Sequence, residues 1–268
     1  MINRILLYAV LSVCAAIMLT PMIWLLAAAF KGNEDLFSYL FFSPRPTLHN
    51  FHKLFESIPF MRYMVNSFFV SGIVVMLQLF FSSLGGFALA KYEFRGKKYV
   101  MLLMLITMLI PGQVLMAPLY ELLFKLRLLD TYTGLVSPWA VSVFGMFLFS
   151  QSMKQIPQSL LEAGRLDGLS EFGIFWNLVL PVCRPMIGAF CLISFMGSWN
   201  NFLWPQIVLN SQEMYTLPVG LSQLTGLLSN EYGALMAGTL LAVLPVGVLF
   251  FLLQREFISG LTAGAVKG

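Results

Sequence analysis

Few residues in this sequence have the types and spacing that bond-making chemistry needs. His49 and His52 lie three positions apart and could share a metal ion, but no cysteine or pair of carboxylates nearby completes a zinc site. Glu121 has Lys125 four residues on, which is the spacing of a local ion pair. An enzyme would need a cluster of His, Asp, Glu or nucleophilic Ser and Cys side chains, and none is recognisable. We therefore expect no catalytic residue and no metal site on this chain.

The composition indicates a membrane protein. The 268 residues are 59% hydrophobic and 10% charged, with a mean hydropathy of +0.83. A soluble domain carries about 25% charged residues, so most of this surface must face lipid rather than water. The three cysteines are odd in number and lie in apolar runs, which does not indicate a disulfide framework. The net charge of +4 is typical of basic cytoplasmic loops and does not call for nucleic acid.

Long apolar runs predict an all-α integral membrane protein with six transmembrane helices. A span needs about 20 mostly apolar residues. The expected spans are approximately 5–30, 64–90, 99–124, 134–153, 183–209 and 233–254, which makes residues 1–268 a single transmembrane domain. The first run is longer than the apolar part of a secretory signal, so we read it as a span. Pro111-Gly112 and Pro205 are expected to break or kink the third and fifth spans.

Basic residues predict the orientation. Lys and Arg between spans stay preferentially on the cytoplasmic side. With the N-terminus inside, ten of the 16 Lys and Arg fall in the cytoplasm and six outside. An even number of spans then places the C-terminus inside as well. The long segment 31–63 would be an external loop whose function is not legible from its residues.

Small and amide side chains within the expected spans suggest helix contacts. Small residues four apart, such as Ser82 and Gly86, let helix backbones approach closely in lipid, within one chain or with a partner. Amide groups are costly in lipid and usually face the interior of a bundle. They could line a solute pathway, or they could form helix-to-helix hydrogen bonds of about 0.6 kcal/mol each. These residues are Gln78, Gln113, Asn200 and Asn201.

One cytoplasmic connection, residues 154–181, predicts two short helices rather than a linker. Pro157 suits a first helical position, and Glu162 could pair with Arg165 one turn on. Gly168 is placed for a left-handed helix stop, and Ser170 can cap a second helix. The hairpin could rest on lipid headgroups, or it could dock into a groove of a cytoplasmic partner.

This connection resembles the EAA loop of ABC importer permeases. That pattern runs Glu-Ala-Ala, three residues, Gly, nine residues, Ile, any residue and Leu-Pro, and here the spacing is complete. The matching positions are Glu162, Ala163, Gly164, Gly168, Leu178, Leu180 and Pro181. Gly164 in place of Ala and Leu178 in place of Ile are the two departures. Gly164 is expected to loosen the first helix by up to roughly 1 kcal/mol.

A second resemblance indicates one branch of the ABC importer permeases. SWNNFLWPQIVL at 198–209, YTLPVGL at 215–221 and QREFISGLTAGAVKG at 254–268 are similar to carbohydrate-uptake permeases of the maltose type, and the similarity covers most of the chain. The tail 255–268 resembles the member of the permease pair whose C-terminus reaches between the ATPase subunits. Its small-residue core is Gly260, Leu261, Thr262, Ala263 and Gly264.

The resemblance implies a permease subunit of an ATP-driven importer in a prokaryotic plasma membrane. A second permease would complete the pathway, two ATPase subunits would bind ATP and Mg, and an extracytoplasmic binding protein would deliver the solute. No phosphate-cradling glycine-rich loop with Lys is present here. The coupling residues implied on the hairpin include Glu162 and Gly168, with Leu160, Phe172 and Phe175 filling a groove on the ATPase.

The same resemblance points to a sugar as solute. Asn200 and Asn201 lie between Trp199 and Trp204, and aromatic faces with amide donors suit a sugar ring. The sequence does not name that sugar. The alternative is a secondary transporter that acts without an ATPase, which would usually show internal repeats and buried ionisable residues. We find neither convincingly.

Overall fold

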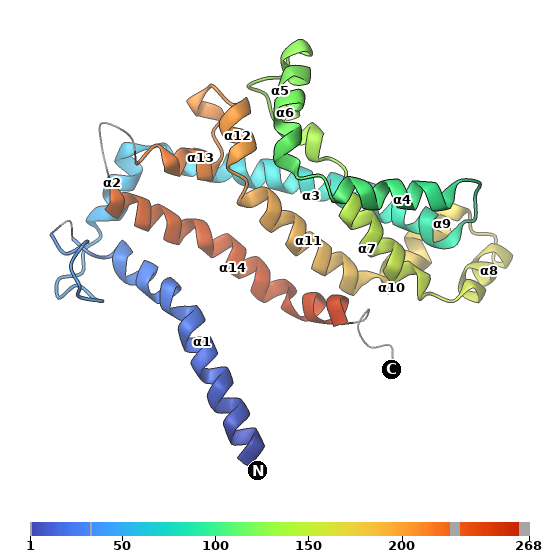
Figure 1. Ribbon diagram of the computed structural model, residues 1–268, viewed down its shortest axis with the longest axis horizontal. Helices are drawn as coiled ribbons and strands as arrows, with labels where there is room; N and C mark the ends of the chain where they lie inside the picture. Colours follow the sequence, from blue (N-terminus) through green and yellow to red (C-terminus); the bar gives the residue numbers. More distant parts are fainter. Residues whose placement is uncertain (1, 33, 226–230, 263–268) are drawn as a thin grey trace. The chain divides into compact units, whose positions relative to one another are not determined.

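The structure is a computed structural model that describes residues 2–32, 34–225 and 231–262, and within these ranges it is helical without a β-strand (Figure 1). The α-helices are α1 (Ile2–Ala29), α2 (His49–Ser57), α3 (Phe60–Lys91), α4 (Lys97–Met108), α5 (Met116–Lys125), α6 (Tyr132–Val136), α7 (Val143–Lys154), α8 (Gln158–Leu166), α9 (Glu171–Ile174), α10 (Leu180–Val182), α11 (Arg184–Trp199), α12 (Leu203–Val208), α13 (Leu217–Ser222) and α14 (Tyr232–Thr262). Short 3₁₀ turns are η1 (Gly112–Leu115), η2 (Ser137–Trp139) and η4 (Gln212–Met214), and η3 (Phe175–Val179) is a π-helical turn. The all-α fold class expected from the sequence is therefore confirmed.

Three helices are long and apolar enough to cross a membrane. They are Arg4–Ala29, Phe60–Lys91 and Tyr232–Gly260. Three further helix pairs pass the same test together, each bent at a short break, so length and composition allow up to six spans among the described residues. The exact count of six stays a prediction.

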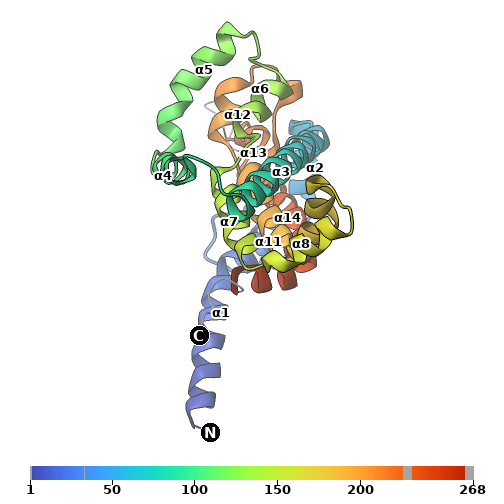
Figure 2. The same ribbon diagram turned by 90° about the vertical axis from the view of Figure 1, so that its right-hand side faces the viewer.

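The bends follow from local backbone chemistry. Between α4 and η1 the chain turns by 91°, at Pro111-Gly112, where the sequence predicts a break (Figure 2). Proline lacks the N–H that a helix needs and clashes with the carbonyl four residues earlier. Pro205 has the same effect on the expected fifth span, because the helix is interrupted at residues 200–202 and restarts as α12. The other two bent pairs are Tyr132–Trp139 with Val143–Lys154, at 44°, and Glu171–Val182 with Arg184–Trp199, at 81°.

The chain divides into two compact units, which we describe separately. The first comprises Met1–Val65 and Thr216–Val246. In it Gly220 packs against the ring of Tyr63, so closely that a Cβ would lie 1.9 Å from Tyr63 Cδ2. Gly238 approaches Leu221 and Leu54 in the same way, at 2.4 and 3.1 Å. In membrane proteins, glycine commonly allows helices to approach one another this closely.

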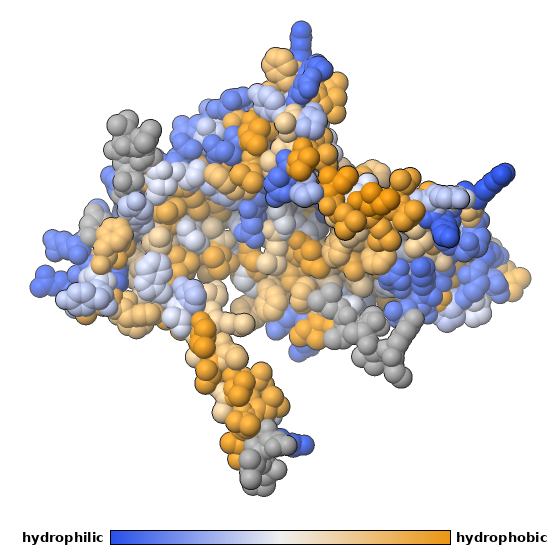
Figure 3. All heavy atoms as spheres, viewed as in Figure 1, coloured by the Kyte–Doolittle hydropathy of each residue, from blue (hydrophilic) through white to orange (hydrophobic). Residues whose placement is uncertain are grey.

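The first unit also contains helix α1, which is almost fully exposed. None of its best apolar window is buried within the chain. The exposed side chains of α1 itself are mostly hydrophobic, and this helix is largely orange in Figure 3. An apolar helix without a protein cover requires lipid or another chain around it.

The second unit comprises Asn66–Tyr215 and Gly247–Gly268. Its α3 and α7 meet at Gly86, where a Cβ would lie 2.5 Å from Phe149 Cβ and 2.9 Å from the Ser150 backbone nitrogen. One turn earlier, Ser82 Oγ donates to the Ser142 carbonyl at 3.1 Å. The small-residue pair Ser82 and Gly86 thus marks a contact within this chain.

Candidate functional site

Helix-capping hydrogen bonds shape the hairpin between α7 and α11. Helix α8 ends in a Schellman motif: Gly168 N donates to the Arg165 carbonyl at 3.1 Å and Leu169 N to the Gly164 carbonyl at 3.0 Å. Gly168 has φ +82°, the left-handed conformation predicted for it. Ser170 Oγ then accepts a hydrogen bond from Gly173 N at 3.1 Å and caps α9, again as predicted. Pro157 lies one residue earlier than expected, at the N-cap position of α8.

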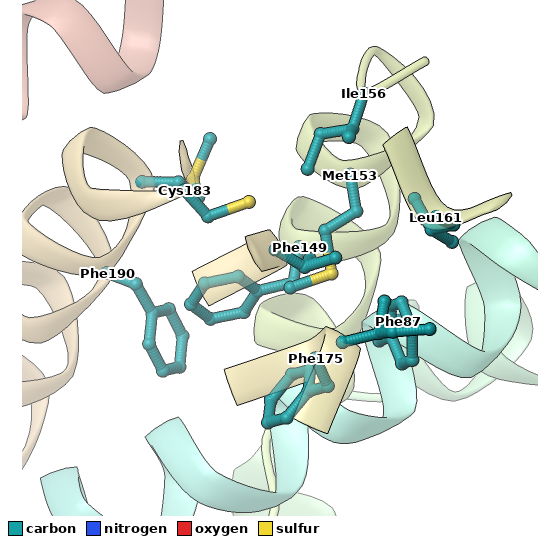
Figure 4. Packing of buried hydrophobic residues seen from close by; sticks show 11 residues of the cluster. Phe87, Phe149, Met153, Ile156, Leu161, Phe175, Cys183 and Phe190 are labelled. Carbon is teal, nitrogen blue, oxygen red and sulfur yellow. The ribbon is translucent and has the colours of Figure 1, made fainter. Parts of the chain in front are cut away.

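A buried apolar cluster holds the hairpin to the helices beside it. Leu161 from α8, and Ile174 and Phe175 from the second arm, pack against Phe87 of α3 and Phe149 of α7 (Figure 4). The rings of Phe87 and Phe175 are 5.4 Å apart. Because these side chains are 5% exposed or less, they fix the hairpin as part of the fold rather than as a loose loop.

The two positions that depart from the EAA pattern contact each other. A Cβ on Gly164 would lie 2.7 Å from Leu178 Cδ1 and 3.2 Å from Ile174 Cγ1. The absence of a side chain at position 164 therefore lets Leu178 occupy the space between the two arms.

Arg165 pairs across the turn. Its Nε donates to Glu171 Oε1 at 2.7 Å and its Nη2 to Oε2 at 3.2 Å, which is the bidentate geometry that guanidinium and carboxylate favour. The expected pairing of Arg165 with Glu162 is wrong, because the turn at Gly168 brings Glu171 to the guanidinium. Tyr92 Oη, from the segment after α3, donates to the same carboxylate.

Three large apolar side chains of the hairpin are exposed, among polar and charged ones. Leu166 is 89% exposed, Phe172 58% and Trp176 57%, and the last two rings are stacked. Phe175 is only 2% exposed. Its expected role in filling a groove on a partner is therefore wrong, because its ring is used inside the chain. Glu162 and Ala163 are exposed beside Leu166, Leu160 is half-buried, and Pro181 is exposed.

The tail lies partly inside helix α14. The helix continues to Thr262, eight residues beyond the end of the expected sixth span. Gly260 is buried, and a Cβ there would lie 2.7 Å from the Pro185 carbonyl of α11. Leu261 belongs to the same helix, while Ala263 and Gly264 lie outside the described residues.

The amide groups proposed for a solute pathway differ in their surroundings. Gln78 bridges helices: its Nε2 donates to the Trp139 carbonyl at 2.7 Å, and its Oε1 accepts from Ser194 Oγ at 2.7 Å. Gln113 is exposed in η1, and Asn200 is exposed in the break after α11. Asn201 Oδ1 accepts from the Trp204 backbone nitrogen at 3.4 Å.

Three tryptophans near these amide groups make aromatic contacts with other rings of the fold. Trp199 is 3% exposed and stacks on Phe195. Trp204 is 1% exposed and meets Trp139 edge to face at 6.4 Å. Both Trp139 and Trp204 have a buried indole N–H without a hydrogen-bond partner. Trp139 thus connects Gln78 to Trp204, a role that its place in a short SPW turn did not signal.

A polar anchor joins the connection after α5 to the segment after α12. Asp130 accepts hydrogen bonds at 3.0 Å from the backbone nitrogens of Asn210 and Ser211, and a further one from Ser211 Oγ. Partial burial raises the pKa of the Asp130 carboxyl, but the hydrogen bonds from Ser211 and Asn210 outweigh that effect, so its pKa lies below the ordinary value. The anchor therefore depends on an ionised carboxylate.

Elsewhere, Lys97 pairs locally with Glu93 and Lys125 with Glu121, whereas Lys53 pairs with the distant Glu231 at 3.5 Å. Lys125 donates to Glu121 at 2.6 Å, which confirms that expectation. Among the described residues no three His, Cys, Asp or Glu side chains lie close enough to hold a metal ion. His49 and His52 are exposed at the start of α2.

These features define a class: a polytopic helical membrane protein with a packed helical hairpin between α7 and α11. A family model described as "binding-protein-dependent transport system inner membrane component" matches residues 82–262, more than half of the chain. The chain belongs to this family.

Relatives cover almost its whole length. The arabinooligosaccharides transport system permease protein AraQ of Halalkalibacterium halodurans is 40% identical over 95% of this chain and 93% of its own. The lactose transport system permease protein LacG of Rhizobium radiobacter is 33% identical over 97% and 95%. The maltodextrin transport system permease protein MdxG of Bacillus subtilis is 32% identical over 100% and 98%. All three are transport permeases rather than enzymes.

A solved structure has the same fold. It is the crystal structure of a bacterial ABC transporter involved in the import of the acidic polysaccharide alginate, with a TM-score of 0.84, 21% identity and 96% of each chain covered.

Proposed function

We propose that this chain is the sugar-specific permease subunit of an ATP-driven importer and that the hairpin at 154–181 couples it to an ATPase. The observation that carries the coupling role is the exposure of the apolar side chains of Leu166, Phe172 and Trp176 on a hairpin whose buried side chains are locked into the fold. Exposed apolar side chains on rigid helices are typical of docking surfaces. Glu162 and Ala163 would lie at the edge of that contact.

The assembly follows from the family resemblance. A second, non-identical permease would complete the pathway, two ATPase subunits would hold ATP and Mg, and an extracytoplasmic binding protein would deliver the solute. The family description and the alginate transporter that was solved with a periplasmic protein support the last partner. Both termini would be cytoplasmic, on the ground of the basic residues between spans. The tail around Gly260 and Thr262 would point toward the ATPase subunits.

The solute is proposed to be an oligosaccharide. The permeases named above are described as carrying arabinooligosaccharides, lactose and maltodextrin. Arabinotriose is the first probe, because the two AraQ proteins share 40% and 41% of residues with this chain. Asn200, Gln113 and the amide nitrogen of Asn201 remain the candidates for a sugar, since Gln78 has both its amide atoms engaged and Asn201 Oδ1 is bonded to the Trp204 backbone nitrogen.

The docking role can be tested by co-purification. The tagged chain would be isolated in mild detergent from its native membrane as wild type, Phe172→Ala with Trp176→Ala, and Tyr99→Ala. Tyr99 is the matched control, because it is an aromatic residue that is 72% exposed and belongs to α4 rather than to the hairpin. We expect an ATPase and a second permease with the wild type and the control, and loss of the ATPase alone from the hairpin variant.

Two results would contradict this proposal. A wild-type chain that purifies without any ATPase would favour a secondary transporter. An ATPase that stays bound to the hairpin variant as firmly as to the control would remove the hairpin from the docking contact.

A further inference from the structure

The end of α3 contacts the hairpin through directional polar bonds as well as through the apolar cluster. Lys91 Nζ donates to the Ile156 carbonyl, at the start of the hairpin. The next residue, Tyr92, donates its hydroxyl to Glu171, at the start of the second arm. The Tyr92 ring also meets Phe87 edge to face at 5.6 Å. Two consecutive residues therefore hold both arms of the hairpin.

Glu171 is the junction of this network. Its carboxylate accepts two hydrogen bonds from Arg165 of α8 and one from Tyr92. Burial, and then the hydrogen bond to Glu171, raise the pKa of the Tyr92 hydroxyl, so it stays protonated and continues to donate. The hydrogen bond to Glu171 raises the pKa of the Arg165 guanidinium, which is charged at any physiological pH. Three separate segments thus meet at one carboxylate.

The network is suited to orientation rather than to stability. The side chains of Arg165 and Glu171 are 37% and 49% exposed, and exposed ion pairs add little to folding. The apolar cluster beneath already holds the hairpin, but apolar contacts have no preferred direction. Hydrogen bonds lose strength steeply when their angles change, so the carboxylate fixes the angle between the hairpin and α3.

We propose that Tyr92 and Arg165 are positioning residues for energy coupling: by holding Glu171 they make the end of α3 follow the hairpin when the ATPase moves it. This inference rests on the docking role proposed above and adds the path by which the displacement reaches a membrane-spanning helix. Without the Tyr92 hydroxyl, the hairpin would still dock but would turn against the end of α3.

The test uses the complete purified complex in proteoliposomes, with its binding protein. Tyr92→Phe removes one oxygen and keeps the ring against Phe87, and Tyr99→Phe removes the same atom from an exposed tyrosine on α4. Two quantities are measured: labelled arabinotriose or maltotriose taken up per ATP hydrolysed, and the dependence of hydrolysis on the binding protein. For Tyr92→Phe we expect the uptake ratio to fall by about fivefold, at the lower end of typical coupling between linked sites. Hydrolysis should then no longer need the binding protein.

A second variant separates positioning from folding. Arg165→Glu should uncouple the complex in the same way, whereas Arg165→Lys should retain part of the ratio, because it keeps a charged donor for Glu171 and leaves the acceptor of the Tyr92 hydroxyl in place. If Tyr92→Phe changes uptake and hydrolysis in equal proportion, the hydroxyl serves structure alone and the proposal is wrong. A wild-type complex that lacks an ATPase would instead refute the docking role on which this inference rests.

Discussion

Gly164 and Leu178 occupy one space between the two arms of the hairpin: a Cβ on Gly164 would lie 2.7 Å from Leu178 Cδ1. Each residue alone is a departure from the EAA pattern. Together they form a complementary pair, because the absence of a side chain at Gly164 leaves room for the Leu178 Cδ1 atom. The glycine therefore need not be only a weak point in α8.

The first prediction follows from this pair. Gly164→Ala should be more destabilising with Leu178 present than in a Leu178→Val background, because valine has no δ carbon to collide with the new methyl group. We expect a coupling energy of about 1 kcal/mol, within the range for residues in contact. Unfolding free energies of the four variants in mixed SDS micelles measure it, and additive effects would contradict the contact.

The second prediction concerns the contact between α3 and α7. Gly86→Ala places a Cβ 2.5 Å from Phe149 Cβ and 2.9 Å from the Ser150 backbone nitrogen, which cannot move aside without shifting α7. We expect a loss of about 1–3 kcal/mol, the usual result of overpacking. Gly72→Ala is the control on the same helix, because a Cβ there meets nothing within 4 Å. It should be neutral or more stable by up to about 1 kcal/mol. Equal thermal stability of the two variants would argue against the close approach.

The third prediction separates structure from transport at Gln78. Gln78→Leu removes both bonds, to the Trp139 carbonyl and to Ser194. We expect a loss of stability of about 1.2 kcal/mol, from two bonds of about 0.6 kcal/mol each, and an unchanged KM for sugar uptake. A variant of normal stability whose KM rises markedly would place this amide in the solute pathway instead.

The fourth prediction is a dependence on pH at Asp130. Because the native pKa of this carboxyl is lowered, its contribution to stability is present above the unfolded pKa of about 3.9. It is lost as the pH falls through the native pKa. At neutral pH, Asp130→Asn should cost about 1 kcal/mol. Asparagine tolerates the positive φ of 55° at this position, so the backbone should not add to the loss.

Thermal midpoints of wild type and Asp130→Asn between pH 3 and 7 in detergent check this, with the exposed Asp167→Asn as control. The two curves should converge only at the acidic end. A constant difference across the range would show that the carboxylate charge is not what holds the loops together.

Local rules explain what the sequence predicted well. The stop at Gly168, the cap at Ser170 and the break at Pro111 each depend on the conformations or hydrogen bonds of one or two residues. Such features can be recognised from spacing alone. The same holds for the apolar spans, because a bilayer requires a minimum length of apolar helix.

Tertiary contacts explain what the sequence predicted poorly. Arg165 has an acidic residue three positions before it and another six positions after it, and only the folded turn decides that it pairs with Glu171. Phe172 and Phe175 look alike in a helical stripe, yet the first is exposed and the second is buried against Phe87. The partner of a long side chain depends on the neighbouring helix, and no local pattern encodes that neighbour.

Helix α14 is a rod of 31 residues, roughly 46 Å long at 1.5 Å per residue. The hydrocarbon layer is only about 30 Å thick, so the excess must be taken up by tilt or by protrusion into the headgroups. The charged residues Arg255 and Glu256 mark the part that leaves the hydrocarbon, and Glu256 packs on Gly188 of α11. We therefore expect the end of α14 to extend a span beyond the hydrocarbon, by a length that changes with the thickness of the bilayer.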